Sequence, residues 1–199
     1  MEPLKIVFVG VGSMGQMAHL RNYAVLPDCK VVAVVEARPE LGKTVAARYG
    51  IPSVFTTPEE LKASGLEFDG FVAIQQYRNQ KNLLPELYAF GKPVLTEKPV
   101  ALGVEWGEKL AALAAENGVT HVMGYHKRSD PAMEFAKTLS DKWRASGKFG
   151  AFRYLRATMP AGDWVANGFE GMLTSDEPFP PAGLEPDVTY FRDPELNKF

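Results

Sequence analysis

Three glycines near the N-terminus have the spacing of a loop that binds phosphate groups. The run is Gly10-Val11-Gly12-Ser13-Met14-Gly15, and an apolar stretch precedes it and a helical pattern follows, as the G-x-G-x-x-G fingerprint requires. Gly10 permits a tight turn, Gly12 leaves room for a pyrophosphate beside the backbone, and Gly15 lets the helix pack closely on the strand. Backbone amides at the helix start, at Ser13 and Met14, would bind the phosphates. The alternative is a glycine-rich turn without a ligand.

An acidic residue follows at the distance that the same fingerprint predicts. Glu36 ends the second apolar stretch, 21 residues beyond Gly15. The fingerprint places an acid about 20 residues on, where it accepts hydrogen bonds from the adenosine ribose. Such a carboxylate repels a 2′-phosphate, so the sequence favours NAD as the cofactor. Arg38 leaves NADP open, because a guanidinium could stack on adenine or pair with that phosphate. The interpretation without a ligand is a solvated acid at a strand end.

Short apolar stretches alternate with helical patterns along the first part of the chain. The expected strands are residues 6–9, 31–35, 54–55, 71–74, 93–96 and 119–123, and the main helices between them are residues 13–25, 39–49, 82–90 and 104–117, with a further helix opening at 57–60. This alternation is typical of βαβ units and of a parallel sheet covered by helices on both faces. Right-handed crossovers then give an α/β doubly wound parallel sheet, the Rossmann fold. We place this dinucleotide-binding domain at residues 1–123.

The pattern changes beyond residue 123. Asp130-Pro131 begins a long helix that runs to about residue 146, and residues 149–159 are predicted to form a strand. One helix and one strand do not make a domain, because a lone strand leaves both of its edges unpaired. We therefore expect residues 124–199 to contain a linker, a helix, a strand and an irregular tail, which begin an incomplete α+β second domain.

Three motifs in order resemble the Gfo/Idh/MocA oxidoreductases, the family of glucose-fructose oxidoreductase and inositol dehydrogenase. They are the glycine loop, the run Gly91-Lys92-Pro93-Val94-Leu95-Thr96-Glu97-Lys98-Pro99, and the linker Met123-Gly124-Tyr125-His126-Lys127-Arg128-Ser129-Asp130-Pro131. The resemblance covers about residues 4–158. It implies that Lys98 lies beside the nicotinamide, where an ammonium would stabilise the alkoxide from which the hydride leaves. It also implies that Glu97 contacts the cofactor or fixes the loop. Without the resemblance, Lys98 would be interpreted as a surface lysine before a proline turn.

The chain departs from the family pattern at three places. Where the family often has T-P-N-x-x-H, the chain has Ile74-Gln75-Gln76-Tyr77-Arg78-Asn79. We expect Gln76 to donate hydrogen bonds to the cofactor or the substrate. In the linker, His126 replaces a common asparagine and is expected to shuttle a proton, since its unperturbed pKa is about 6.5; a hinge histidine bonded to backbone is the alternative. No histidine follows His126 to complete the family's second-domain acid/base pair, so we expect a truncated chain or a lost half.

The resemblance implies hydride transfer between a nicotinamide cofactor and a secondary hydroxyl or carbonyl of a sugar or cyclitol. The cofactor is expected to be NAD, with NADP as the alternative, and the partner is a small sugar or polyol. Two other functions stay open. One is an NAD(H)-binding module or subunit without turnover of its own. The other is a family member that uses transient oxidation for isomerisation or hydrolysis.

The composition excludes several other classes of protein. Hydrophobic residues make up 46% of the chain and charged residues 23%, which is ordinary globular usage and not that of a disordered chain or a coiled coil. The net charge of −2 offers no basic excess for a nucleic acid or an anionic membrane. The single cysteine cannot form an internal disulfide, no targeting or membrane segment is visible, and no metal-ligand spacing occurs. We expect a cytoplasmic protein without a bound metal ion. The sequence leaves open whether the protein forms a homo-oligomer.

Overall fold

The computed structural model describes residues 2–158, 162 and 168–179, and these residues fall into two units. The first unit consists of the chain up to Gly124 together with a segment that returns to it from Phe169. The second unit lies between Tyr125 and Gly168. The sequence assigned all of residues 124–199 to a second domain, whereas the described residues 169–179, the returning segment, pack with the first unit.

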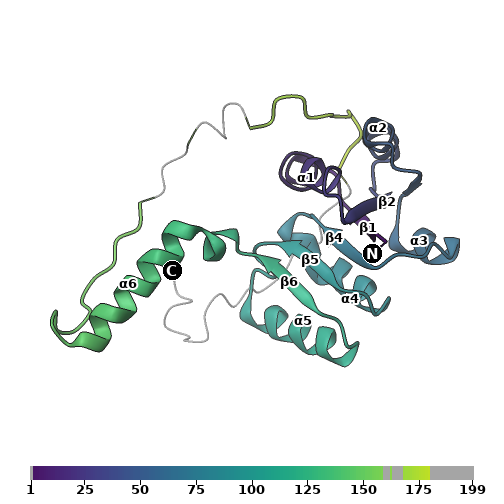
Figure 1. Ribbon diagram of the computed structural model, residues 1–199. Coiled ribbons are helices and arrows are strands. Elements are labelled where there is room, and N and C mark those ends of the chain that lie inside the picture. The colour runs from purple at the N-terminus through teal and green to yellow at the C-terminus, as the bar shows by residue number, and fades with distance from the viewer. Residues whose placement is uncertain (1, 159–161, 163–167, 180–199) are drawn as a thin grey trace. The chain divides into compact units, whose positions relative to one another are not determined.

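The first unit is built on a parallel sheet (Figure 1). In chain order its strands are β1 (Leu4–Val9), β2 (Cys29–Val35), β3 (Ser53–Phe55), β4 (Gly70–Ala73), β5 (Val94–Glu97) and β6 (His121–Gly124). They lie in the order β3-β2-β1-β4-β5-β6, and each neighbouring pair is parallel. This is the strand order of the Rossmann fold, so the predicted α/β doubly wound sheet is confirmed.

Helical segments connect these strands. They are η1 (Gly15–Leu20), which continues into α1 (Arg21–Tyr23), then α2 (Pro39–Tyr49), α3 (Pro58–Ser64), η2 (Tyr77–Asn79), α4 (Gln80–Tyr88) and α5 (Val104–Glu116). The first helix was predicted over residues 13–25, and in the structure its central part, η1, is a π-helix. Such π-helical turns occur frequently at functional sites.

Local signals fix the ends of several helices. Thr57 caps α3 by accepting a hydrogen bond from the Glu60 amide at 3.2 Å, as its place before a proline predicts. Gly50 follows α2 and Gly65 follows α3, each with the left-handed backbone that ends a helix at little cost.

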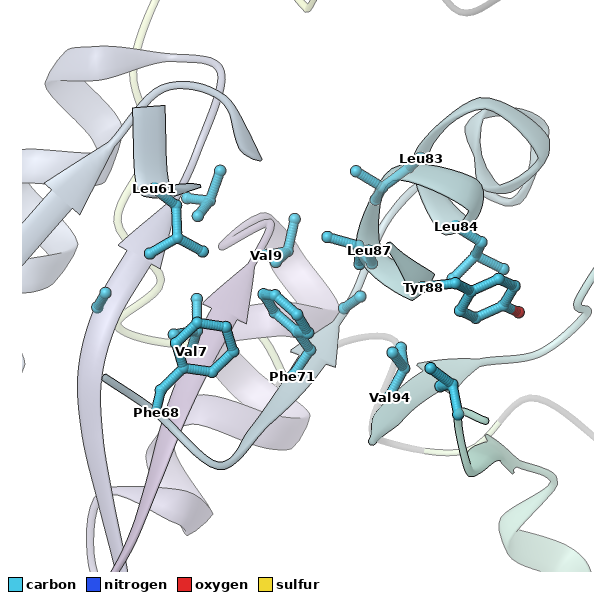
Figure 2. Packing of buried hydrophobic residues seen from close by; sticks show 14 of the residues in the cluster. Val7, Val9, Leu61, Phe68, Phe71, Leu83, Leu84, Leu87, Tyr88 and Val94 are labelled. Atoms are coloured by element: carbon cyan, nitrogen blue, oxygen red, sulfur yellow. The ribbon is translucent and has the colours of Figure 1, made fainter. Parts of the chain in front are cut away.

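Two hydrophobic clusters hold the helices on opposite faces of the sheet. On one face, η1 and α2 pack through side chains such as Leu20 and Leu41. On the other face, α3, α4 and α5 pack through Leu61, Leu87 and Leu110, and Figure 2 shows part of this cluster. All five side chains are at most 2% exposed. Burial on both faces explains why the strands are continuous apolar runs, and it holds the loops at the strand ends in place.

The second unit begins with the 3-10 helix η3 (His126–Ser129) and the helix α6 (Pro131–Ser146). Helix α6 begins at the Asp130-Pro131 pair, as predicted, and Asp130 caps it by accepting a hydrogen bond from the Ala132 amide at 2.9 Å. The predicted strand over residues 149–159 is wrong, because the described residues 149–158 contain no strand. A strand needs a backbone partner, and none pairs with this stretch in the described part of the chain. Within the same ranges, no helix has both the length and the apolar character to cross a membrane.

His121, at the start of β6, lies between two hydroxyl groups. Its Nδ1 is 2.8 Å from the Tyr88 hydroxyl oxygen, and its Nε2 is 2.9 Å from Thr96 Oγ1. Burial lowers the pKa of the His121 imidazole, since the charged form loses its hydration. The neutral ring is therefore the form that the fold stabilises.

We expect the free energy of unfolding to fall as the pH drops below about 6.5, the ordinary pKa of histidine. The unfolded chain then binds a proton that the folded His121 resists, and the loss ends below the folded pKa. It amounts to at most about 1.4 kcal/mol for each pH unit. Chemical denaturation between about pH 7.5 and 5.5 measures it, with His121→Gln as a variant that cannot titrate here. An identical pH dependence of the two chains would contradict the assignment.

Candidate functional site

A pocket of about 320 Å³ lies at the carboxyl ends of β1, β2 and β4. The strand order reverses between β1 and β4, and ligands of doubly wound sheets bind at this switch point. Most of the residues predicted to bind the cofactor line this pocket: Gly10, Gly12, Ser13, Met14, Gly15, Glu36, Arg38 and Gln76. The other lining residues are Ala37, Ile74, Gln75, Asn79 and Phe179.

The three glycines of the loop have different surroundings. Gly10 has a φ of +86°, and a Cβ there would lie 2.3 Å from the carbonyl oxygen of Ile74. A Cβ on Gly15 would lie 2.5 Å from the carbonyl oxygen of Gly10. A Cβ on Gly12, in contrast, would meet its nearest atom, Arg38 Nη2, at 3.7 Å. Gly10 and Gly15 are thus required by the fold, whereas the space beside Gly12 belongs to the pocket.

Glu36 is a buried acid, not the solvated one that the sequence left open. It is 5% exposed, and its Oε2 accepts a hydrogen bond from the Val11 amide at 2.9 Å. Its Oε1 accepts from Arg38 Nε at 2.7 Å and from the Arg38 amide at 3.2 Å. The carboxylate therefore ties the glycine loop to the start of α2, and the guanidinium of Arg38 offsets its charge.

The loop after β5 is fixed by side chains from other elements. Glu97 Oε1 lies 2.9 Å from His19 Nε2, and Glu97 Oε2 accepts from the Lys98 amide at 3.2 Å. Gln80 Nε2 donates to the carbonyl oxygens of Glu97 and Pro99, each at 2.9 Å. These contacts fit the second of the two expected roles of Glu97, which is to fix the loop. Sequence reasoning missed Gln80, which is 2% exposed.

Lys98 and Glu97 do not line the pocket. Lys98 is exposed and follows β5, in which Thr96 is in register with Ala73 of β4. Lys98 therefore leaves the sheet at the same edge as Gln75, which lines the pocket. This placement agrees with a role beside the reacting end of a cofactor. His126 is exposed and belongs to the second unit, and its role stays a prediction.

The structure adds Phe179 to the pocket, from the returning segment. No periodicity or motif in the sequence pointed to this residue. Among the described residues, no three His, Cys, Asp or Glu side chains are grouped so that they could hold a metal ion.

Residues 4–125 match the family described as "Oxidoreductase family, NAD-binding Rossmann fold", which is the Gfo/Idh/MocA family. The chain therefore belongs to the Gfo/Idh/MocA oxidoreductase family.

Curated relatives and a solved structure agree with this membership. D-glucoside 3-dehydrogenase of Escherichia coli (strain K12) is 25% identical over 127 residues, which are 64% of this chain and 36% of the relative. The scyllo-inositol 2-dehydrogenase (NAD(+)) of Bacillus subtilis (strain 168) is 26% identical over 140 residues, 69% of this chain and 40% of the relative. The structure of scyllo-inositol dehydrogenase from Lactobacillus casei with bound NAD(H) and scyllo-inositol matches with a TM-score of 0.65 and 23% identity, over 72% of this chain and 42% of that one. The chain thus spans less than half the length of these relatives, and the structural likeness supports the fold.

Proposed function

We propose that this chain binds NAD and serves hydride transfer between the nicotinamide and a secondary hydroxyl or carbonyl of a sugar or cyclitol. The observation that carries the proposal is the pocket at the switch point of the sheet, with the glycine loop and Glu36 in its wall. The substrate class is supported by relatives that are named for a glucoside and an inositol.

The residues of the pocket fit a dinucleotide. The open space beside Gly12 suits a pyrophosphate, and the amides of Ser13 and Met14 precede the first helical hydrogen bond, which runs from Gln16 to Gly12 at 2.9 Å. These amides and the positive end of the helix would both attract the phosphates. Glu36 and Gln76 line the pocket. In this proposal Glu36 would accept hydrogen bonds from the adenosine ribose, and Gln76 would donate to the cofactor or the substrate.

NAD, when bound, would supply the hydride acceptor. The ammonium of Lys98 would stabilise the negative charge that develops on the substrate oxygen as its proton leaves and that is lost as the hydride departs and the carbonyl forms. Glu97, held by His19, would keep the Lys98 backbone in place. In this scheme His126 would carry the proton to solvent.

We expect the chain to bind NADH more tightly than NADPH, because a 2′-phosphate would meet the carboxylate of Glu36. In Glu36→Gln, the affinity for NADPH relative to that for NADH should rise by about tenfold. Arg38 loses its ionic partner, so its guanidinium becomes available to the 2′-phosphate. Glutamine keeps an oxygen for the Val11 amide, so the loop is retained. Nicotinamide fluorescence titrations measure both constants. Tighter binding of NADPH than of NADH by the unaltered chain would contradict the proposed cofactor.

A further inference from the structure

The returning segment is anchored on the helices that border the pocket. Gln16 of η1 donates from Nε2 to the carbonyl oxygen of Leu173 and accepts from the Leu173 amide at Oε1, both at 2.9 Å. The Leu173 side chain packs against the hydrophobic cluster of the same face. Two residues before Leu173, the carbonyl oxygen of Gly171 accepts a hydrogen bond from Arg48 of α2. Contacts with two different helices therefore hold residues 171–173 in place.

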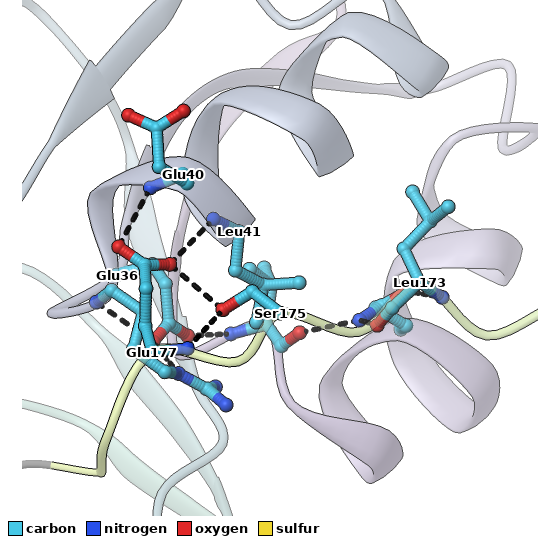
Figure 3. A network of polar contacts seen from close by, with 9 residues as sticks. Glu36, Glu40, Leu41, Leu173, Ser175 and Glu177 are labelled. Carbon is cyan, nitrogen blue, oxygen red and sulfur yellow. Dashed lines mark hydrogen bonds and ion pairs between the residues drawn. The ribbon is translucent and has the colours of Figure 1, made fainter.

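Glu177 of this segment caps α2. Its Oε1 accepts a hydrogen bond from the Glu40 amide at 3.1 Å, and its Oε2 accepts from the Leu41 amide at 3.0 Å (Figure 3). Ser175 holds the carboxylate by donating from Oγ to Glu177 Oε2 at 2.8 Å. Arg38, the residue at the N-cap position, provides no side-chain cap of its own. A carboxylate from 137 residues away thus occupies the positive end of α2.

The bonding of Glu177 favours its charged form. Partial burial raises the pKa of this carboxyl, but the hydrogen bonds from the Glu40 and Leu41 amides outweigh it and hold the pKa below the ordinary value. At neutral pH the start of α2 therefore carries a full negative charge.

Phe179 brings the segment to the adenosine end of the pocket. The guanidinium carbon of Arg38 lies 4.3 Å from the centre of the Phe179 ring, an arrangement in which the cation stacks on the aromatic face. Arg38 is thus held by Phe179 on its face and by Glu36 at its Nε. Two features that attract a 2′-phosphate in this fold, a nearby arginine and a helix N-terminus, already have partners within the chain.

The charges near this end of the pocket single out Glu177. The carboxylate of Glu36 is paired with Arg38 at 2.7 Å. The carboxylate of Glu40 is exposed, pairs with Lys43 at 2.9 Å, and points away from Glu177 in Figure 3. Glu177 is bonded to amides and a hydroxyl, and the cations Arg38 and Lys43 attract it only through longer-range charge interactions. Its charge is therefore less offset by a cation than the charges of the two other acids.

We propose that Glu177 determines cofactor specificity by occupying, with its carboxylate, the position at the start of α2 that the 2′-phosphate of NADP would need. Glu177 can have this role only if the pocket binds a dinucleotide, so this inference rests on the proposed function. NAD lacks this phosphate and leaves the cap of α2 undisturbed.

The test is the substitution Glu177→Gln in the full chain, with titrations of NADH and NADPH followed by nicotinamide fluorescence. We expect the dissociation constant for NADPH to fall by about tenfold while that for NADH stays within about twofold. Glu40→Gln is the matched control, because it also removes one negative charge beside the first turn of α2, but from a carboxylate that pairs with Lys43. This control should leave the ratio of the two constants unchanged. Thermal unfolding of each variant verifies that α2 remains folded.

Three results would overturn the assignment. An unchanged NADPH-to-NADH ratio in Glu177→Gln, with NADH still bound, would refute the role of Glu177 and leave the proposed function intact. An equal gain in affinity for both cofactors would show that the segment obstructs the pocket and does not discriminate. Failure of the unaltered chain to bind either cofactor would refute the proposed function and, with it, the role of Glu177.

Discussion

Replacement of Lys98 by alanine is expected to lower kcat for hydride transfer by about 10²- to 10³-fold, the usual loss when one group that stabilises a developing oxyanion is removed. The affinity for NADH should stay within a few-fold. Lys98 is exposed at the carboxyl edge of β5, and it does not line the pocket in which we place the dinucleotide. Its ammonium should therefore act on the charge that forms during the reaction and contribute little to ground-state binding.

The measurement compares kcat, with a polyol or glucoside substrate, and the NADH dissociation constant between the unaltered protein and Lys98→Ala. Lys92→Ala is the matched control, because Lys92 precedes β5 and lies at the amino end of the same strand. This variant should keep both constants. Full turnover by Lys98→Ala would remove Lys98 from the mechanism. A proportionate loss of NADH affinity would instead make it a binding residue.

The sheet and the glycine loop could be predicted from the sequence because their signals are local. Apolar runs such as residues 31–35 mark strands that are buried on both faces, and Gly10 and Gly15 mark positions where a side chain would collide with backbone. Thr57 and Asp130 precede prolines at helix starts, and both cap the helices that follow. In each case the signal lies in residue types a few positions apart, even where, as at Gly10, the contact itself is with a distant residue, Ile74.

Features that depend on distant partners were beyond the sequence. Gln80 lies just before the helix predicted over residues 82–90 and belongs to no motif, yet its side-chain amide holds the loop that contains Lys98. Glu177 lies in a stretch without periodicity, and its partners on α2 are 136 and 137 residues away. The same limit explains the incorrect strand over 149–159, because strand-forming side chains do not supply the neighbouring strand that pairing requires.

The chemistry of Glu36 shows a second kind of limit. The sequence located this acid at the end of β2 and predicted that its charge repels a 2′-phosphate. The structure pairs that charge with Arg38, only two residues away. Spacing can therefore locate a charged group, but the electrostatic effect of the group depends on the partners that the fold gives it.

Binding of a dinucleotide beside Gly12 is the claim on which the proposed activity and the role of Glu177 both depend. Gly12→Val is expected to weaken NADH binding by about 100-fold or more, because the new side chain fills the space meant for the pyrophosphate. The fold should tolerate it, since the nearest atom to a Cβ at this position is Arg38 Nη2 at 3.7 Å. Gly107→Ala on α5 is the control, where an added Cβ meets Val100 Cγ1 at 3.9 Å.

The decisive measurement is a fluorescence titration of NADH into the unaltered chain, Gly12→Val and Gly107→Ala, with thermal unfolding of all three. We predict saturable binding of NADH by the unaltered chain and by Gly107→Ala, and loss of this binding in a folded Gly12→Val. Equal NADH affinity in Gly12→Val and the unaltered chain, or no binding by the unaltered chain, would contradict a dinucleotide site beside Gly12.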